Sequence, residues 1–249
     1  MRTFPQEIVD KVIDELPLYN GGTSYNVPYS LVSKAWVTRT QKHCFRSIVL
    51  DVVDYLEKWG RNIAPDPAGV SRHTHELFLF NVDTLEDFEA HIHAFTRVKD
   101  LKIIQCKFLL SSSPSIAEYF APTCSNLTQL RIDLAETTSR IITSLLAGLP
   151  QLKHFTTLGL KVTDDTGGTN LVSRIPFFEG NNSLVLHTHW EQNDSPGPPD
   201  WIPPSARFEN LEIDITYFLH KAASVNQWFS NSCTTLTSFS INVSPDCEC

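Results

Sequence analysis

Eight short apolar segments recur along this chain at a nearly constant spacing, and that periodicity limits its possible folds more than any other feature. The first core residue of each segment is expected at positions 48, 77, 101, 130, 158, 184, 211 and 239 of the 249 residues. The intervals between them are 29, 24, 29, 28, 26, 27 and 28 residues. Repeats of this length are typical of solenoids, in which each unit packs only on its neighbours.

Each segment alternates apolar and polar residues, as a half-buried strand does. We expect strands at 47–50, 76–79, 100–103, 129–132, 157–160, 183–186, 210–213 and 238–241. Helical patterns lie between several of them, at 85–95, 115–120, 138–146 and 217–229. Because parallel strands joined by a helix close as a right-handed crossover, residues 47–249 are predicted to form an α/β solenoid with a parallel sheet.

The units near 161–207 are less regular than the others. DDTGGTN and NDSPGPPDWIPP are loops by composition, and the second is expected to be a mobile excursion. The last unit ends at SINVSPDCEC without an evident polar cap, which a solenoid normally has. We therefore expect association at the sheet edge after Ile241.

Alternation also assigns the two faces of the sheet. Leu130 and Ile132 are expected to point into the solenoid, so Arg131 and Asp133 point onto a concave face lined by strands. Mixed charge and exposed aromatic rings suit a protein or peptide substrate, although many of these positions could simply be solvated. The predicted substrate-binding residues are Phe78, Phe80, Lys102, Arg131, Asp133, Lys161, His187, Glu212 and Asp214.

The first 46 residues have a different pattern, that of two amphipathic helices joined by a loop. The first helix has apolar residues at positions 8, 9, 12, 13 and 16 and is ended by Pro17. The second is expected from about Tyr29 to Phe45. About forty residues are too few to be stable alone, so these helices must bury their apolar side chains against something else.

FPQEIVDKVIDEL, followed after a loop by SLVSKAW and CFRSIVL, resembles an F-box, the module that docks ubiquitin-ligase receptors onto a Skp-type adaptor. The resemblance covers residues 3–47, with Phe4 where the family usually has leucine, Tyr29 where cysteine is common, and a longer loop. It implies a module at 1–46 whose apolar anchors enter a groove of the adaptor. The implied adaptor-binding residues are Phe4, Pro5, Ile8, Val9, Ile13, Leu16, Leu31, Val32 and Trp36.

SNLTQLRIDL and CTTLTSFSINV resemble the degenerate leucine-rich repeats that follow F-boxes in many fungal proteins. The two resemblances together imply the substrate-recognition subunit of a cullin-RING ligase of the SCF type. Its partners would be the Skp-type adaptor, the cullin scaffold and an unknown protein substrate. The alternative is an interaction scaffold without a ligase, in which the F-box-like helices cap the solenoid.

Composition argues against other classes of function. A net charge of −8 disfavours nucleic-acid binding, and no apolar run is long enough to span a membrane. The amino terminus lacks the pattern of a signal peptide, so we expect a cytoplasmic or nuclear protein. Since nucleophile elbows and phosphate-binding loops are also absent from the sequence, we predict no catalytic residue and no cofactor. A metal site at His187, His189 and Glu191 is the remaining enzyme hypothesis, and we do not favour it.

Overall fold

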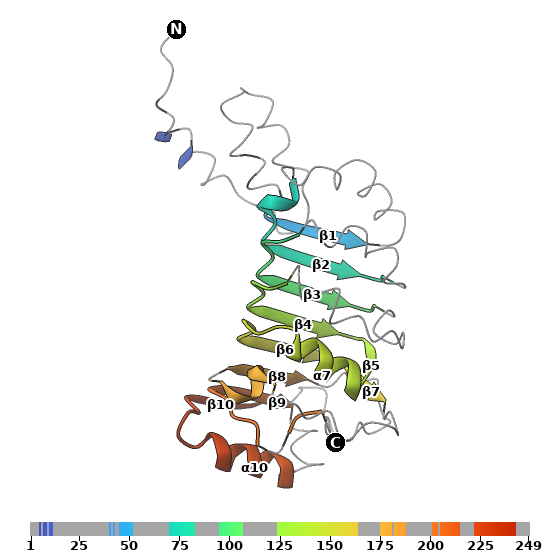
Figure 1. Cartoon of the computed structure of the whole chain (residues 1–249), viewed down its shortest axis with the longest axis vertical. Coiled ribbons are helices and arrows are strands. Elements are labelled where there is room, and N and C mark those ends of the chain that lie inside the picture. The colour runs from blue at the N-terminus through green and yellow to red at the C-terminus, as the bar shows by residue number, and fades with distance from the viewer. Residues whose placement is uncertain are drawn as a thin grey trace.

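The computed structural model of the chain has a parallel sheet of eight strands as its main element (Figure 1). The residues that it describes are 5, 7–8, 10–11, 40, 42, 45–51, 70–82, 95–106, 124–163, 175–180, 182–187, 201–203, 205–214 and 222–242. The sheet consists of β1 (Ser47–Asp51), β2 (Glu76–Phe80), β3 (Asp100–Ile104), β4 (Gln129–Asp133), β6 (His154–Leu158), β8 (Ser183–His187), β9 (Asn210–Asp214) and β10 (Ser238–Asn242). The predicted α/β class with a parallel sheet is confirmed.

The strands lie side by side in the order in which they occur along the chain. Their register aligns equivalent positions, so the first core residue of each strand faces its counterpart on the next. This row is Ile48, Leu77, Leu101, Leu130, Phe155, Leu184, Leu211 and Phe239. The periodicity in the sequence therefore corresponds to a ladder of stacked residues in the sheet.

One prediction in this ladder was wrong, because the fifth strand is His154–Leu158 and not 157–160. The segment HFTTLGL offers two alternating frames, one through Phe155 and Thr157 and the other through Leu158 and Leu160. In the structure Phe155 is fully buried and aligned with Leu130, whereas Leu158 is only half-buried. The bulk of the phenylalanine decides the frame, and the two intervals become 25 and 29 residues.

A left-handed residue ends four consecutive strands at the same position of each unit. These residues are Asn81, Gln105, Leu134 and Gly159, with φ of 54°, 54°, 50° and 62°. Their N–H groups donate to the carbonyl oxygens of Ile104, Asp133, Leu158 and His187 at 3.1, 3.0, 2.7 and 2.9 Å. Positive φ is uncommon outside glycine, so its recurrence with the same hydrogen bond identifies the units as structural repeats.

Below the sheet the core changes along the molecule. The first four strands bury aliphatic side chains such as Leu79, Ile103 and Ile132. The later units bury a chain of aromatic rings, with centroids 5.4 to 6.3 Å apart between successive partners. The rings are Phe155, Phe177, Phe178, Trp201, Phe208 and Trp228. Trp201 belongs to the segment expected to be a mobile excursion, and that expectation is wrong at this residue, which is 4% exposed.

The remaining elements are short. The helix expected at 138–146 is α7 (Ser139–Ala147), whose first turn is capped by Thr138 Oγ1 accepting from Ile141 N at 3.3 Å. The helix expected at 217–229 is described as α10 (Ala222–Ser232), and η1 (Val70–His73) and α8 (Pro176–Glu179) are single turns. β5 (Glu136–Thr138) and β7 (Lys161–Thr163) form a separate pair. The helices expected at 85–95 and 115–120 lie outside the described residues, except Phe95, which is buried and not helical.

Little of the F-box-like segment is described. Glu7, Ile8, Asp10 and Lys11 are helical, and Ile8 N donates to Pro5 O at 3.0 Å. Within the described part of the chain, no helix has the length and hydropathy that a membrane crossing requires. The other implied anchors lie outside the described residues: Phe4, Val9, Ile13, Leu16, Leu31, Val32 and Trp36.

Candidate functional site

The candidate site is the face of the eight-stranded sheet opposite the core, here called the open face. It corresponds to the surface predicted to be concave. Its central row is Val49, Phe78, Lys102, Arg131, Thr156, Val185, Glu212 and Ser240. A second row, nearer the carboxyl ends of the strands, contains Phe80, Ile104, Asp133, Leu158, His187, Asp214 and Asn242. Adjacent strands are about 4.8 Å apart, so neighbours within a row can contact one another.

Eight of the nine predicted substrate-binding residues lie on this face, and Lys161 does not. Lys161 belongs to β7, outside the main sheet, where its Nζ lies 3.3 Å from Glu136 Oε1 on β5. The wrong frame for the fifth strand caused this error. With the correct frame, β6 contributes Thr156 and Leu158 instead, and sequence reasoning missed both. It also missed Val49, which the alternation with Ile48 and Leu50 could have identified.

The section over β1 to β3 is apolar and carries one prominent cation. Val49 is 54% exposed, and Phe78, Phe80 and Ile104 are half-buried. Lys102 Nζ lies 4.4 Å from the centroid of the Phe78 ring, in the geometry of a cation–π contact. This section offers an apolar partner side chain a surface with Lys102 beside it, whose charge is partly offset by Asp100 Oδ2 at 4.0 Å.

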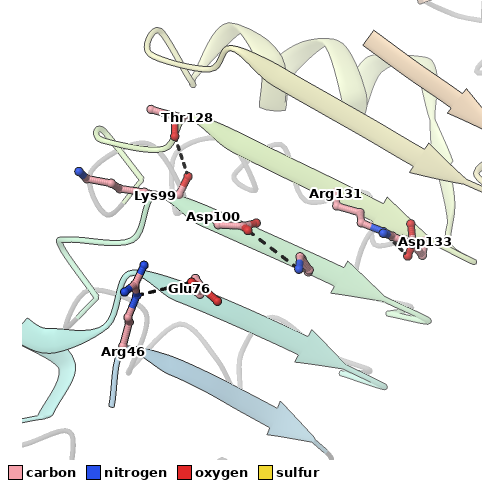
Figure 2. Close-up of polar contacts among 8 residues, drawn as sticks. Arg46, Glu76, Lys99, Asp100, Thr128, Arg131 and Asp133 are labelled. Carbon is pink, nitrogen blue, oxygen red and sulfur yellow. Dashed lines mark hydrogen bonds and ion pairs between the residues drawn. The ribbon is translucent and has the colours of Figure 1, made fainter. Parts of the chain in front are cut away.

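A partly satisfied ion pair lies at the centre, on β4 (Figure 2). Arg131 Nε lies 2.6 Å from Asp133 Oδ2, but Asp133 Oδ1 is buried without a hydrogen-bond partner. Asp133 is 4% exposed, and this burial raises the pKa of its carboxyl group although Arg131 opposes the shift. An unsatisfied buried oxygen costs stability, so a ligand that donates a hydrogen bond to it would gain affinity.

Buried carboxylates were not what the alternation predicted. Asp133 and Asp214 have the predicted direction, toward the open face, but they are 4% and 7% exposed instead of solvated. The neighbours of Asp133 in the row are the larger residues Ile104 and Leu158. The alternation of apolar and polar residues predicts on which face of the sheet a side chain lies. It does not predict how deeply the side chain is buried, because burial depends on the neighbouring strands.

The section over β8, β9 and β10 is polar. His187 Nε2 lies 3.0 Å from Glu212 Oε1, and Asn242 Nδ2 donates to the same oxygen at 2.6 Å. The three residues come from three successive strands, and Asn242 Nδ2 also lies 3.2 Å from His187 Nε2. Within the described residues no three metal-ligating side chains gather, and His189 and Glu191 lie outside them. This section presents fixed donors and acceptors in a defined order.

No protein-family model matches the chain, and no curated protein sequence matches it. Its function is therefore argued from the residues and the geometry described above.

Proposed function

We propose that the chain is the substrate-recognition subunit of an SCF-type ubiquitin ligase. The F-box-like helices bind a Skp-type adaptor, which connects to the cullin scaffold, and the open face binds a protein segment. The observation that carries the proposal is the open face itself, where the exposed Val49, half-buried apolar side chains and an unsatisfied carboxylate oxygen lie along successive strands. A partner gains free energy by covering the apolar side chains and by donating a hydrogen bond to that oxygen.

The repeat geometry supports a leucine-rich-repeat solenoid as the carrier of this face. Such repeats follow the pattern L-x-x-L-x-L-x-x-N/C. One unit buries Val98, Leu101, Ile103 and Cys106 at that spacing, each at 1% exposure or less. Cys106 Sγ contacts the carbonyl oxygens of Leu79 and Ile104 at 3.5 and 3.3 Å. A cysteine thus tethers neighbouring turns where regular repeats have an asparagine ladder.

The adaptor half of the proposal rests on the resemblance of residues 3–47 and on the exposure of one anchor. Ile8 is 48% exposed, so its side chain is accessible to a partner. Helix-in-groove recognition uses exposed apolar residues of this kind. Full burial of such a side chain stabilises a complex by about 1.5–3 kcal/mol.

A receptor of this class needs no catalytic residue of its own. Holding a substrate close to the ubiquitin-charged enzyme raises its effective concentration, and that is the receptor's contribution to the reaction. The open face then determines which proteins are held. Its apolar section supplies contact area, and its polar section supplies selectivity, because unpaired polar groups penalise the wrong partner.

Co-purification of the full chain with a Skp-type adaptor tests the proposal. Ile8→Asp should abolish capture while the circular dichroism spectrum is retained. The matched control is Val49→Asp, a similar change at a similarly exposed apolar residue that lies on the open face. Val49→Asp should leave adaptor capture intact. Failure of the wild-type chain to capture any adaptor would remove the ligase function.

One observation favours the alternative, an interaction scaffold whose amino-terminal helices serve only as a cap. Thr40, in the second expected helix, is 2% exposed, so that helix buries part of its surface within the chain. In a scaffold the first helix would also be required for folding. Ile8→Asp would then lower the thermal midpoint of the repeat region, whereas in a ligase receptor it lowers adaptor affinity alone.

A further inference from the structure

The amino ends of the first three strands gather basic side chains on a chain that is acidic as a whole. We call this surface the basic edge. Figure 2 shows Arg46 and Lys99 at the starts of β1 and β3, at the opposite end of the strands from Asp133. The basic edge comprises Lys42, Arg46, Arg72, His73, His75, Arg97 and Lys99.

The repeat itself builds the centre of the edge. Arg46, His75 and Lys99 each stand two residues before the first core residue of their unit. His75 N donates to Arg46 O at 2.8 Å, and Lys99 N donates to His75 O at 2.8 Å. These three residues are therefore successive rungs about 4.8 Å apart, a spacing that lets one anion reach two of them.

The other residues of the basic edge flank Arg46, His75 and Lys99. Arg72 Nε donates to His73 Nε2 at 3.1 Å, so that imidazole nitrogen accepts and carries no proton. Burial lowers the pKa of both His73 and His75, and nearby cations lower it further. The charges of Lys42 and Arg97 both contribute to lowering the pKa of His73 and of His75.

Opposing charge is sparse at the edge. Arg46 Nε lies 3.7 Å from Glu76 Oε1, with side chains 57% and 35% exposed, so solvent screening weakens this pair. Within the described part of the chain, the other Lys and Arg residues of the edge form no ion pair. Asp100, which follows Lys99 in the sequence, lies 4.0 Å from Lys102 on the open face. In later units the rung positions are Thr128, Lys153, Asn182, Glu209 and Thr237, so the concentration of charge is local.

We propose that the basic edge is a binding site for a phosphorylated or acidic peptide segment of a partner protein. Arg72 and Arg97 offer planar guanidinium donors that suit phosphate and carboxylate oxygens. A peptide fits better than a nucleic acid, because a nucleic-acid backbone needs a long basic track. Here three units are basic, and the whole chain has 28 acidic against 20 basic residues.

The basic edge lies at the amino ends of the strands and is separate from the central rows of the open face. Binding there does not depend on an adaptor. The proposal therefore goes beyond the ligase function and stands or falls separately. Burial and, to a smaller extent, nearby cations lower the pKa of His73 and His75, and a bound anion offsets those cations, so proton uptake should accompany binding. Replacing both histidines by glutamine should remove this proton uptake.

Fluorescence anisotropy with the full chain tests the proposal. The probe is a labelled peptide, Gly-Gly-phosphoSer-Gly-Gly-phosphoSer-Gly-Gly, compared with its unphosphorylated form and with hexaglutamate. We expect the phosphopeptide to bind at low salt and the unphosphorylated peptide not to bind. Arg97→Glu with Lys99→Glu should weaken phosphopeptide binding about tenfold or more. Binding of hexaglutamate at comparable affinity would identify carboxylates, and not only phosphates, as ligands of the site.

The matched control is Arg140→Glu with Arg207→Glu, which changes the net charge equally at two exposed residues outside the edge. The control should retain the wild-type affinity. Equal loss in both double variants would mean a general charge effect and would overturn the site. An eight-thymidine oligonucleotide that binds more tightly than the phosphopeptide, with the same dependence on Arg97 and Lys99, would overturn the choice of a peptide. Should the glutamate pair unfold the protein, Arg97→Gln with Lys99→Gln should still weaken binding severalfold, and unchanged affinity there would also overturn the site.

Discussion

The first four strands and the last four share one backbone pattern and differ in almost everything their side chains do. In both halves the strands are parallel and aligned position by position. Among the described residues, the first half buries mainly aliphatic side chains together with Phe95, and its open face is apolar over β1 to β3, with the basic edge beside it. The second half packs on aromatic rings in mostly edge-to-face contact and has a polar open face. The backbone hydrogen bonds between strands therefore set the register of the repeats, and the side chains of the core and of the open face can differ from one half to the other.

The difference lies in the residues that fill the core below the sheet. β2, β3, β4 and β6 each end in a left-handed residue whose N–H donates to the following strand of the sheet. Beyond β6, Phe177 and Phe178 on α8 and Trp201 on an irregular segment fill the space below the sheet.

The largest expected effect tests which of the two alternating frames the fifth strand uses. Phe155→Ala should lower the free energy of unfolding by about 3–5 kcal/mol, since it empties a site between Phe177 and Trp201. Leu158→Ala, on the open face, should cost about 1 kcal/mol. Chemical denaturation of both variants gives the comparison. A larger loss for Leu158→Ala would show that the fifth unit belongs to the other frame.

The next effect concerns the left-handed turn that the regular units share. Gly159→Ala should destabilise the protein by about 1–2 kcal/mol, because a Cβ is unfavourable at φ of 62°. Gln105→Gly, at the exposed equivalent position, should stabilise it by up to about 1 kcal/mol. The two thermal midpoints should thus move in opposite directions. If both thermal midpoints moved in the same direction, the turns at Gly159 and Gln105 would not be equivalent.

A substitution of Asp133, on β4 at the boundary between the halves, tests whether this residue serves stability or binding. Its raised carboxyl pKa means that the folded state holds this proton more tightly than the unfolded chain. The stabilising contribution is present below the unfolded pKa near 3.9 and is lost as pH rises through the folded value. Asp133→Asn should therefore keep or raise stability at pH 7 and flatten this dependence, as measured by denaturation at several pH values. A marked loss of stability at pH 7 would make Asp133 a structural residue instead of a binding residue.

The smallest effect comes from the basic edge of the first half. His73 and His75 have lowered pKa values, so the unfolded chain binds more protons near pH 6 than the folded protein does. Stability should fall as pH drops from 7 through the ordinary histidine value of 6.5. His73→Gln with His75→Gln should reduce this fall, and thermal midpoints at pH 7.5 and 5.5 measure it. An unchanged pH dependence would mean that the two imidazoles do not contribute.

Sequence reasoning succeeded where local pattern determines structure. Alternation around Leu101, Leu130 and Leu211 was sufficient to place their strands, and the 138–146 pattern was sufficient for α7. It failed at HFTTLGL, where two frames compete and packing against Phe177 and Trp201 decides between them. It also could not foresee that Asp133 is buried or that Trp201 joins the core, because both depend on residues distant in the sequence.

The basic edge shows a different kind of limit. Arg46, His75 and Lys99 are unremarkable in the sequence, and their separation of 24 to 29 residues becomes a line of neighbours only through the register. Knowing the period would have been enough to find them. The signal was thus present in the repeat and was missed because only strand positions were compared between units.

The central claim is that the amino-terminal segment and the open face serve two different partners, and titration calorimetry with a purified Skp-type adaptor tests it most directly. We predict one adaptor bound per chain with a negative heat-capacity change, as burial of apolar anchors requires. Ile8→Asp should weaken this binding at least about tenfold, whereas Val49→Asp should leave it unchanged. Absence of binding by the wild-type chain, or equal weakening by the two substitutions, would contradict the account.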